Sequence, residues 1–475
     1  MSNFKELESV QHVRIVDLIS EGEIEGLVDG NKSIFIDGTP LFDEDDNPNF
    51  GDTDEKDLQI EKTTGTHNQE PIKDFAKPAS PTSVITTVNN GAPVTRTITN
   101  LNVDQVRITL TFPALYKLEN GEFKDRKVNY SITRTYKNNS VTVGNPETFE
   151  YEIKGKTQSS FQRDHLIDID TITDTYDAVN LTVTKVTGND DLTETPRKRF
   201  TEFIFSQYVE IINEKMRYPH SALVALRLNA KSFNSIPQRK YEIKGIKVKI
   251  PSIIVSNAEE VKVASATGRI RYPENGVWNG TFQTDPKWTA CPAWCLYDLL
   301  TNTRYGAGIP ESSLDKFDFF EISKYCNAKI ENSDDPRFSL NLVINSRKEI
   351  YNVISELTAV FRGIAYYGAG SLVLLQDKPA DAQYLIGQAN VVEGLFTYSG
   401  TSHKARHTVA CVAWQSYDMQ GEVQYEYVED QGAIEKYGII KKDIKSIGCY
   451  SQKQAQRLGR WALLSEQNLT ETCQF

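Results

Sequence analysis

Alternating polar and apolar residues dominate residues 81–200 and predict a series of short strands. Clear examples, rich in threonine, valine and isoleucine, are the segments 95–99, 106–112, 130–136 and 179–184. Side chains of a strand point alternately to its two faces, so a period of two indicates strands that are buried on one side. Many such strands separated by short turns favour a β-sandwich, inserted between parts of a surrounding domain.

Strand patterns also flank this region, at 33–36, 201–205, 221–228 and 241–250. In the last of them Gly245, Lys247 and Lys249 share one face, while Ile246, Val248 and Ile250 share the other. Together with Lys244 they form a lysine-lined strand. Such a strand either protects a sheet edge against aggregation or faces a partner, and a polyanion such as DNA passing through a channel is one alternative.

The pattern changes to a period of 3.6 after residue 290. Helices are predicted at 292–300, 314–326, 347–362 and 452–469, and the third has a continuous apolar stripe that includes Ile350, Val353, Ile354 and Leu357. Proline at position 292 suits the first turn of a helix. Strands are predicted between these helices at 364–367, 371–376 and 407–414. The C-terminal part is therefore expected to be an α+β domain.

Length and charge narrow the class of protein. A chain of 475 residues predicts two to four domains, and it contains no run of eighteen apolar residues that would span a membrane. Its net charge of −11 argues against a dedicated nucleic-acid binder. Residues 43–74 hold eleven acidic residues and three lysines, and we expect an exposed acidic loop there, with a site for a cation or a basic partner as the alternative.

The N-terminal sequence has acidic residues throughout and no unbroken apolar core, which argues against a secretory signal. The six cysteines are too sparse for a disulfide scaffold, so we interpret them as reduced thiols and expect synthesis in a cytoplasm. Cys291 and Cys295 are the only close pair. With no second paired motif they are either buried thiols or, less simply, metal ligands.

The other candidate constellations do not form a catalytic or binding site. If 407–414 is a strand, His403, His407 and Cys411 extend over about 26 Å and cannot share an ion. Gly22, Gly26 and Gly30 are separated by acidic residues that would repel a phosphate, and no G-x-S-x-G motif occurs. Trp278 and Trp288 either fill a core or bind sugar. We therefore predict a protein that is not an enzyme, with no catalytic, cofactor-binding or metal-binding residues.

A series of short motifs nevertheless carries a family resemblance. They include Ile19–Gly22, Ile24–Gly26 and Val28–Gly30 near the start, then 95–99, 153–157, 218–219, 222–224, 276–282, 292–298, 304–306, 376–379, 428–430, 437–438, 448–449, 454–455 and Trp461. Each is weak alone, but their order and spacing make the sequence similar to the tip attachment protein J (host specificity protein J) family of lambda-like siphophages. The similarity covers the N-terminal hub portion of that family.

The resemblance implies a mainly β fold of the baseplate-hub type, with β-rich domains and an α+β part. It is consistent with a first hub domain formed by 1–45 and 205–255. Residues 46–204 are then an inserted β-rich domain that includes the acidic loop at 43–74. Residues 256–475 are expected to form a second hub domain of the α+β class.

The resemblance further implies a structural protein of the virion, at the distal tip of the viral tail. Its expected partners are two further copies in a homotrimer, neighbouring tail tip proteins, the tail tube and the C-terminal end of the tape-measure protein. Phage DNA would pass without sequence-specific binding during ejection. Members of the family continue into a receptor-binding fibre, so host-cell recognition is not assigned to these residues. A carbohydrate-binding adhesin using Trp278 and Trp288, and a tail-associated glycosidase, are the alternatives.

Overall fold

The computed structural model describes residues 12–50, 58–72, 81–169, 175–191, 193, 198–212, 216–233, 235–330, 333–346, 348–368, 370–382, 384–402 and 405–475. The chain divides into two compact units. Unit 1 comprises Met1–Ile19 and Leu41–Gln238, and unit 2 comprises Ser20–Pro40 and Arg239–Phe475. The fold is mostly β, as predicted. The hub-domain boundaries given above remain a prediction.

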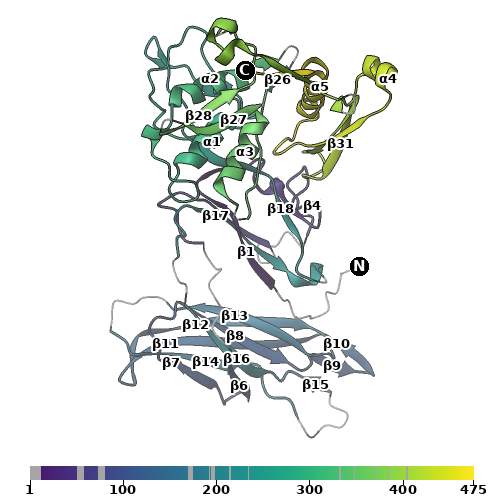
Figure 1. The fold of residues 1–475 in the computed structure, drawn as a ribbon. Coiled ribbons are helices and arrows are strands. Elements are labelled where there is room, and N and C mark those ends of the chain that lie inside the picture. The colour runs from purple at the N-terminus through teal and green to yellow at the C-terminus, as the bar shows by residue number, and fades with distance from the viewer. Residues whose placement is uncertain are drawn as a thin grey trace. The chain divides into compact units, whose positions relative to one another are not determined.

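Two four-stranded sheets in unit 1 share one hydrophobic core (Figure 1). The first has the order β12-β11-β14-β7, formed by Val141–Gly155, Arg126–Asn138, Ala178–Lys185 and Val94–Ile98. The second has the order β13-β8-β16-β6, formed by Phe161–Asp168, Gln105–Phe112, Ile204–Ile211 and Thr82–Thr87. Buried side chains alternate along β14, and β8 is buried more continuously. The predicted strands at 106–112, 130–136 and 179–184 are therefore confirmed.

Two smaller sheets complete unit 1. One has the order β10-β9-β15, formed by Glu122–Lys124, Tyr116–Glu119 and Arg199–Phe200. The other has the order β1-β17-β5, formed by His12–Glu21, Ser221–Asn229 and Leu58–Thr64. Part of the acidic segment 43–74, which was expected to be a loop, is therefore a strand. Nearer its start, the carboxylate of Asp43 accepts hydrogen bonds from the backbone N–H groups of Asp45 and Asn47 and closes a turn.

Unit 2 begins with two three-stranded sheets. Strands β18-β3-β4 are Arg239–Tyr241, Ile34–Ile36 and Thr39–Pro40, and strands β2-β19-β24 are Ile24–Leu27, Ile243–Val248 and Lys287–Trp288. Short two-stranded pairs follow: β20-β21 (Ile254–Val255, Ala258–Glu259), β22-β23 (Lys262–Val263, Ile270–Arg271) and β25-β26 (Lys329–Ile330, Ser333–Pro336). The sheet β2-β19-β24 joins N-terminal residues to residues more than two hundred positions later.

Three helices form the main core of unit 2. They are α1 (Pro292–Thr301), α2 (Lys316–Cys326) and α3 (Ile350–Val360), and all three contribute side chains to one cluster that includes the buried ring of Trp294 in α1. The hairpin β27-β28, Gly363–Gly368 and Ser371–Gln376, packs beside them. The helices predicted at 292–300, 314–326 and 347–362 are confirmed. The aspartate at 315 caps α2, because its carboxylate accepts a hydrogen bond from the N–H of Phe317.

A second core in unit 2 lies between helix α5 (Gln452–Asn468) and the sheet β31-β30-β32 (Val423–Glu429, Val409–Gln415, Lys441–Lys445). Helix and sheet lie close at Gly459, where a Cβ would be 2.8 Å from Cγ2 of Val428. Strands β29 and β33 (Thr397–Gly400, Glu471–Gln474) pair with each other. The predicted helix at 452–469 is confirmed, whereas helix α4 (Gln431–Tyr437) was not predicted.

Candidate functional site

The three lysines singled out from the sequence lie along one segment of unit 2. Lys244 and Lys247 are in β19, and Lys249 follows its last residue. Lys244 pairs in register with Gly26 of β2, and Lys247 with Trp288 of β24, so β19 is the middle strand of its sheet. The interpretation as an edge guard is therefore wrong. The edge-guard interpretation failed because β2 and β24, the strands on either side of β19, are short, and β2 lies far from β19 in the sequence.

Each of the three ammonium groups already has a neighbour within unit 2. Lys247 Nζ lies 2.8 Å from Oε1 of Glu23, and Lys249 Nζ lies 2.7 Å from Oε1 of Glu311. Lys244 Nζ is 5.6 Å from the centre of the Trp288 ring, a cation–π distance. The hydrogen bond from Lys249 lowers the pKa of Glu311. Both carboxylates offset the positive charge of the segment, which weakens it as a site for phosphate groups.

The motif at 276–282 fills a core. Trp278 is only 5% exposed, and its ring centre lies 5.0 Å from that of Phe320, 5.4 Å from Phe282 and 5.8 Å from Trp294. Its indole N–H donates to the carbonyl oxygen of Thr281. A ring enclosed in this way cannot stack on a sugar. Of the two interpretations of Trp278, the core interpretation is confirmed.

The motif at 304–306 holds the N-terminal glycine motif in place. The hydroxyl of Tyr305 donates to Oδ2 of Asp298 at 2.7 Å, and Arg304 forms an ion pair with Glu21. A Cβ on Gly22 would lie 2.8 Å from Cε1 of Tyr305, and Gly22 has a φ of +112°. Burial raises the pKa of Asp298, although the hydrogen bond from Tyr305 opposes this. Gly22 is therefore required by close packing as well as by its backbone geometry, and Gly26 and Gly30 also have positive φ values.

The structure does not bring the cysteine candidates at 291 and 295 and the histidine candidates together into one site. Cys291 precedes helix α1 and its Sγ lies 3.3 Å from Oγ of Ser323, while burial raises the pKa of the thiol. Cys295 contacts the carbonyl oxygen of Thr289 instead. His407 Nδ1 lies 2.8 Å from Oε2 of Glu466, and Cys411 is buried in β30. His403 lies outside the described residues. Within the described ranges, no group of three or more His, Cys, Asp or Glu side chains could hold a metal ion.

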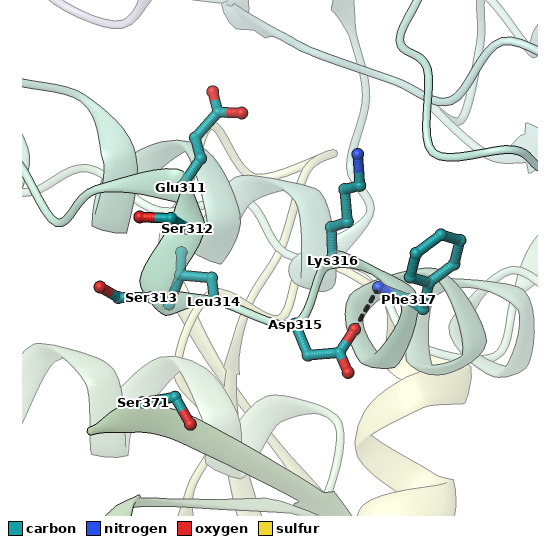
Figure 2. A pocket seen from close by; sticks show the side chains of 8 residues that line it. All are labelled: Glu311, Ser312, Ser313, Leu314, Asp315, Lys316, Phe317 and Ser371. Carbon is teal, nitrogen blue, oxygen red and sulfur yellow. Dashed lines mark hydrogen bonds between the residues drawn. The ribbon is translucent and has the colours of Figure 1, made fainter. Parts of the chain in front are cut away.

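A surface pocket of about 530 Å³ lies before and at the start of helix α2 (Figure 2). Glu311–Phe317 and Ser371 line it. Its charged side chains bind other groups of the protein. Glu311 forms an ion pair with Lys249, and Lys316 donates a hydrogen bond to the carbonyl oxygen of Gly280 at 2.7 Å. Asp315 turns back to cap its own helix, as the dashed line in Figure 2 shows. The three charged side chains of the pocket therefore already have partners within unit 2.

One cluster that the sequence did not indicate is a histidine pair, His67 and His220, in unit 1. The two residues are 153 positions apart, and neither belongs to a recognisable motif. The strand pairing of β5 with β17 places the segments that carry them side by side. Within the described part of the chain, no helix is long and apolar enough to cross a membrane.

Comparison with known proteins gives the class. Residues 78–214 match the family model described as tip attachment protein J, FNIII-A domain, and residues 349–475 match the model of a putative phage tail protein. The chain is 30% identical over 471 residues to tip attachment protein J of Escherichia phage SECphi4, which covers 97% of this chain and 39% of that protein. The corresponding protein of Escherichia phage SECphi27 is 28% identical over 470 residues, with coverages of 97% and 37%.

These matches make the chain similar to bacteriophage tail proteins. More closely, it is similar to the tip attachment proteins J over nearly its whole length, and the resemblance drawn from the ordered motifs is confirmed. The chain spans less than half the length of these two relatives. Among solved structures, the stem and receptor-binding domain of spike protein P1 from bacteriophage PM2 aligns at 9% identity. It covers 48% of this chain and all of that one, with a TM-score of 0.19, too low to bear on the fold.

Proposed function

We propose that the chain is a structural hub of a siphophage tail tip. Three copies close the distal end of the tail tube and contact the C-terminal end of the tape-measure protein and the neighbouring tip proteins. The hub opens during host entry to let DNA leave. Synthesis takes place in the cytoplasm of the bacterial host, and the assembled protein is part of the virion.

The observation that carries this proposal is the match to two tip attachment proteins J over 97% of the chain. The names of these relatives describe tip attachment, and neither name describes an enzyme. The similarity extends through both compact units rather than one widespread domain type, so it supports a shared role of the whole region.

Self-association is supported by apolar side chains that unit 2 leaves exposed. Among the described residues between 342 and 398, eight large apolar side chains are at least 65% exposed: Val343, Tyr351, Ile364, Tyr367, Tyr384, Leu385, Val392 and Tyr398. Two-stranded sheets such as β27-β28 are marginally stable alone, and one face of this hairpin carries Ile364 and Tyr366 in exposed positions. Large contiguous patches of exposed apolar side chains mark interaction surfaces, and we propose that these side chains form such a patch. In the proposed trimer they pack against a second copy of this chain.

The charge distribution supports passage of DNA without retention. Binding to duplex DNA requires cations that neutralise phosphates, and this chain carries a net charge of −11. Two of the three candidate lysines, Lys247 and Lys249, each form an ion pair with a glutamate. A wall of this kind would release DNA readily.

The adhesin alternative loses its principal residue, because Trp278 is enclosed by other aromatic rings. Two carboxylates, Glu311 and Asp315, line the pocket beside α2, but each already has a partner within the protein, which does not favour the glycosidase alternative. The structural role is therefore the better supported of the three.

Immunogold imaging of purified phage with an antibody against this chain tests the location. Gold confined to the distal end of the tail is expected. Unlabelled tails would contradict the proposal if an antibody to an established tip protein labels the same particles. For self-association, light scattering of the purified chain should give three times the mass of one chain. The variant Tyr384→Ser/Leu385→Ser should lower that mass, whereas the control Val277→Ser, 88% exposed outside this set, should not.

A further inference from the structure

Two histidine rings meet at one end of the β5-β17 strand pair. His67 follows β5 and His220 immediately precedes β17, in which Ala222 pairs with Thr64. Nδ1 of His67 lies 3.0 Å from Nε2 of His220, and the ring centres are 5.0 Å apart at an interplanar angle of 41°. His67 is exposed and His220 is partly buried. Both rings are therefore reachable from solvent.

The turn that presents His220 is held in an uncommon conformation. Tyr218 and His220 both have positive φ values, +45° and +65°, which cost side-chain-bearing residues free energy. The buried amide of Gln69 fixes this turn by donating to the carbonyl oxygens of Arg217 and Tyr218, both at 2.7 Å, and of Ser221 at 3.0 Å. Its own carbonyl accepts from the N–H of Gly65. One side chain thus ties the segment carrying His67 to the strained turn carrying His220.

The spacing of the two nitrogens suits metal coordination. Imidazole nitrogens bind late first-row metals at about 2.0–2.1 Å, so two ligands at a right angle are about 2.9 Å apart and two at a tetrahedral angle about 3.3 Å. The observed 3.0 Å is close to the right-angle value. Square-planar and octahedral geometries with right-angle ligands are typical of Cu²⁺ and Ni²⁺.

We propose that His67 and His220 form a two-histidine binding site for Cu²⁺ or Ni²⁺, with water completing the coordination. Without metal, one ring nitrogen donates its proton to the other. Binding moves that proton to the remaining nitrogen of the same ring, so both imidazoles stay neutral and present a lone pair to the ion. Since the described residues include no group of three ligands, the site keeps open positions. This inference does not depend on the proposed tail-tip function.

Titration of the chelator-treated full chain with NiCl₂ in a calorimeter tests the site, and the expected result is one ion per chain with Mg²⁺ giving no heat. The variants are His67→Gln and His220→Asn, the latter chosen because asparagine tolerates a positive φ. Each should weaken binding at least tenfold. The control His407→Gln alters a histidine that instead pairs with Glu466, and it should bind as the parent does.

A Cu²⁺ electron paramagnetic resonance spectrum gives a second readout, and coupling to two imidazole nitrogens is expected. Absence of Ni²⁺ binding by the parent chain overturns the proposal and leaves the pair as a simple hydrogen bond. Unchanged binding in both folded variants overturns it as well, as does a spectrum with no nitrogen coupling. Circular dichroism of each variant shows whether it has folded. If a variant does not fold, the Cu²⁺ electron paramagnetic resonance spectrum of the parent chain tests the proposed site instead.

Discussion

The hydroxyl oxygen of Tyr130 and Nε2 of His165 lie 2.9 Å apart between the two sheets of the β-sandwich in unit 1. Tyr130 comes from β11 and His165 from β13, and the ring of Tyr151 in β12 lies with its centre 4.0 Å from that of His165. Burial lowers the pKa of His165 to about 4, since a charged imidazolium is unfavourable there. The charges of the flanking Asp164 and Arg163 act in opposite directions and are smaller.

This pair predicts that the sandwich loses stability in mild acid. The pKa of His165 is about 4 in the folded chain and 6.5 when unperturbed, so the unfolded chain alone binds a proton between these values. The stabilisation is complete above pH 6.5 and falls as the pH drops toward 4, by about 3 kcal/mol in total. Hydrogen exchange of peptides covering β11 and β13 should measure this loss.

The control for this prediction is His165→Gln, which cannot be protonated. Its exchange, corrected for intrinsic chemistry, should be much less dependent on pH over the same range. The same acid sensitivity in parent and variant would show that another group controls the stability of the sandwich.

A second prediction concerns Gly22. The substitution Gly22→Ala should lower the free energy of unfolding of unit 2 by about 3 kcal/mol, because it combines an unfavourable φ with a clash against the Tyr305 ring. Gly30→Ala is the control: its φ is +54° but no heavy atom lies within 4 Å, so it should cost about 1 kcal/mol. Urea unfolding followed by tryptophan fluorescence reports on unit 2, which contains all five tryptophans.

Equal losses for the two alanine variants would contradict the clash. Tyr305→Ala introduced into the Gly22→Ala chain should recover part of the loss by making room.

A third prediction separates the two interpretations of the motif at 276–282. Trp278→Ala should destabilise unit 2 by about 3–5 kcal/mol, since it leaves a cavity among aromatic rings. The adjacent Val277 is 88% exposed, and Val277→Ala should change stability by less than about 0.5 kcal/mol. Thermal unfolding by calorimetry measures both. A Trp278→Ala chain with unchanged stability would reopen a role of this ring in ligand binding.

A fourth prediction concerns the lysine segment. Lys244→Ala/Lys247→Ala/Lys249→Ala should leave binding of a duplex DNA fragment at low salt weak and within twofold of the parent chain. Both ion pairs are partly exposed and contribute about 0–1 kcal/mol each, so the variant should fold. Fluorescence anisotropy measures the affinity. A tenfold loss, with a shallower dependence on salt, would show that these lysines hold DNA.

The sequence predicted most of the longer elements, because each of them carries a local period. Helix α3 has its apolar stripe, and β14 alternates buried and partly exposed residues. Helix α4 was missed since it has seven residues and only Ala433 is buried, although Asp430 and Gly438 are typical start and stop residues. Strand β5 was concealed by acidic composition around Leu58 and Ile60.

The placement of the candidate residues was not predictable to the same degree. Whether β19 is a central or an edge strand depends on β2 and β24, which are short and distant in the sequence. The His67–His220 pair depends on a turn held by the side chain of Gln69. Local patterns do not encode such contacts, because they are made by side chains that meet only after the strands have paired.

The division of the chain has a consequence for its synthesis. Strands β2 and β3 leave the ribosome early, but their partners β19 and β18 follow about two hundred residues later. At a synthesis rate of roughly 5–20 residues per second, the two strands remain without these partner strands for about ten to forty seconds. The residues made during this interval belong to unit 1, whose sandwich can fold meanwhile. During this interval the nascent chain exposes strand edges of β2 and β3 while the sandwich of unit 1 folds. Chaperone binding is therefore most useful to the chain at this stage of its synthesis.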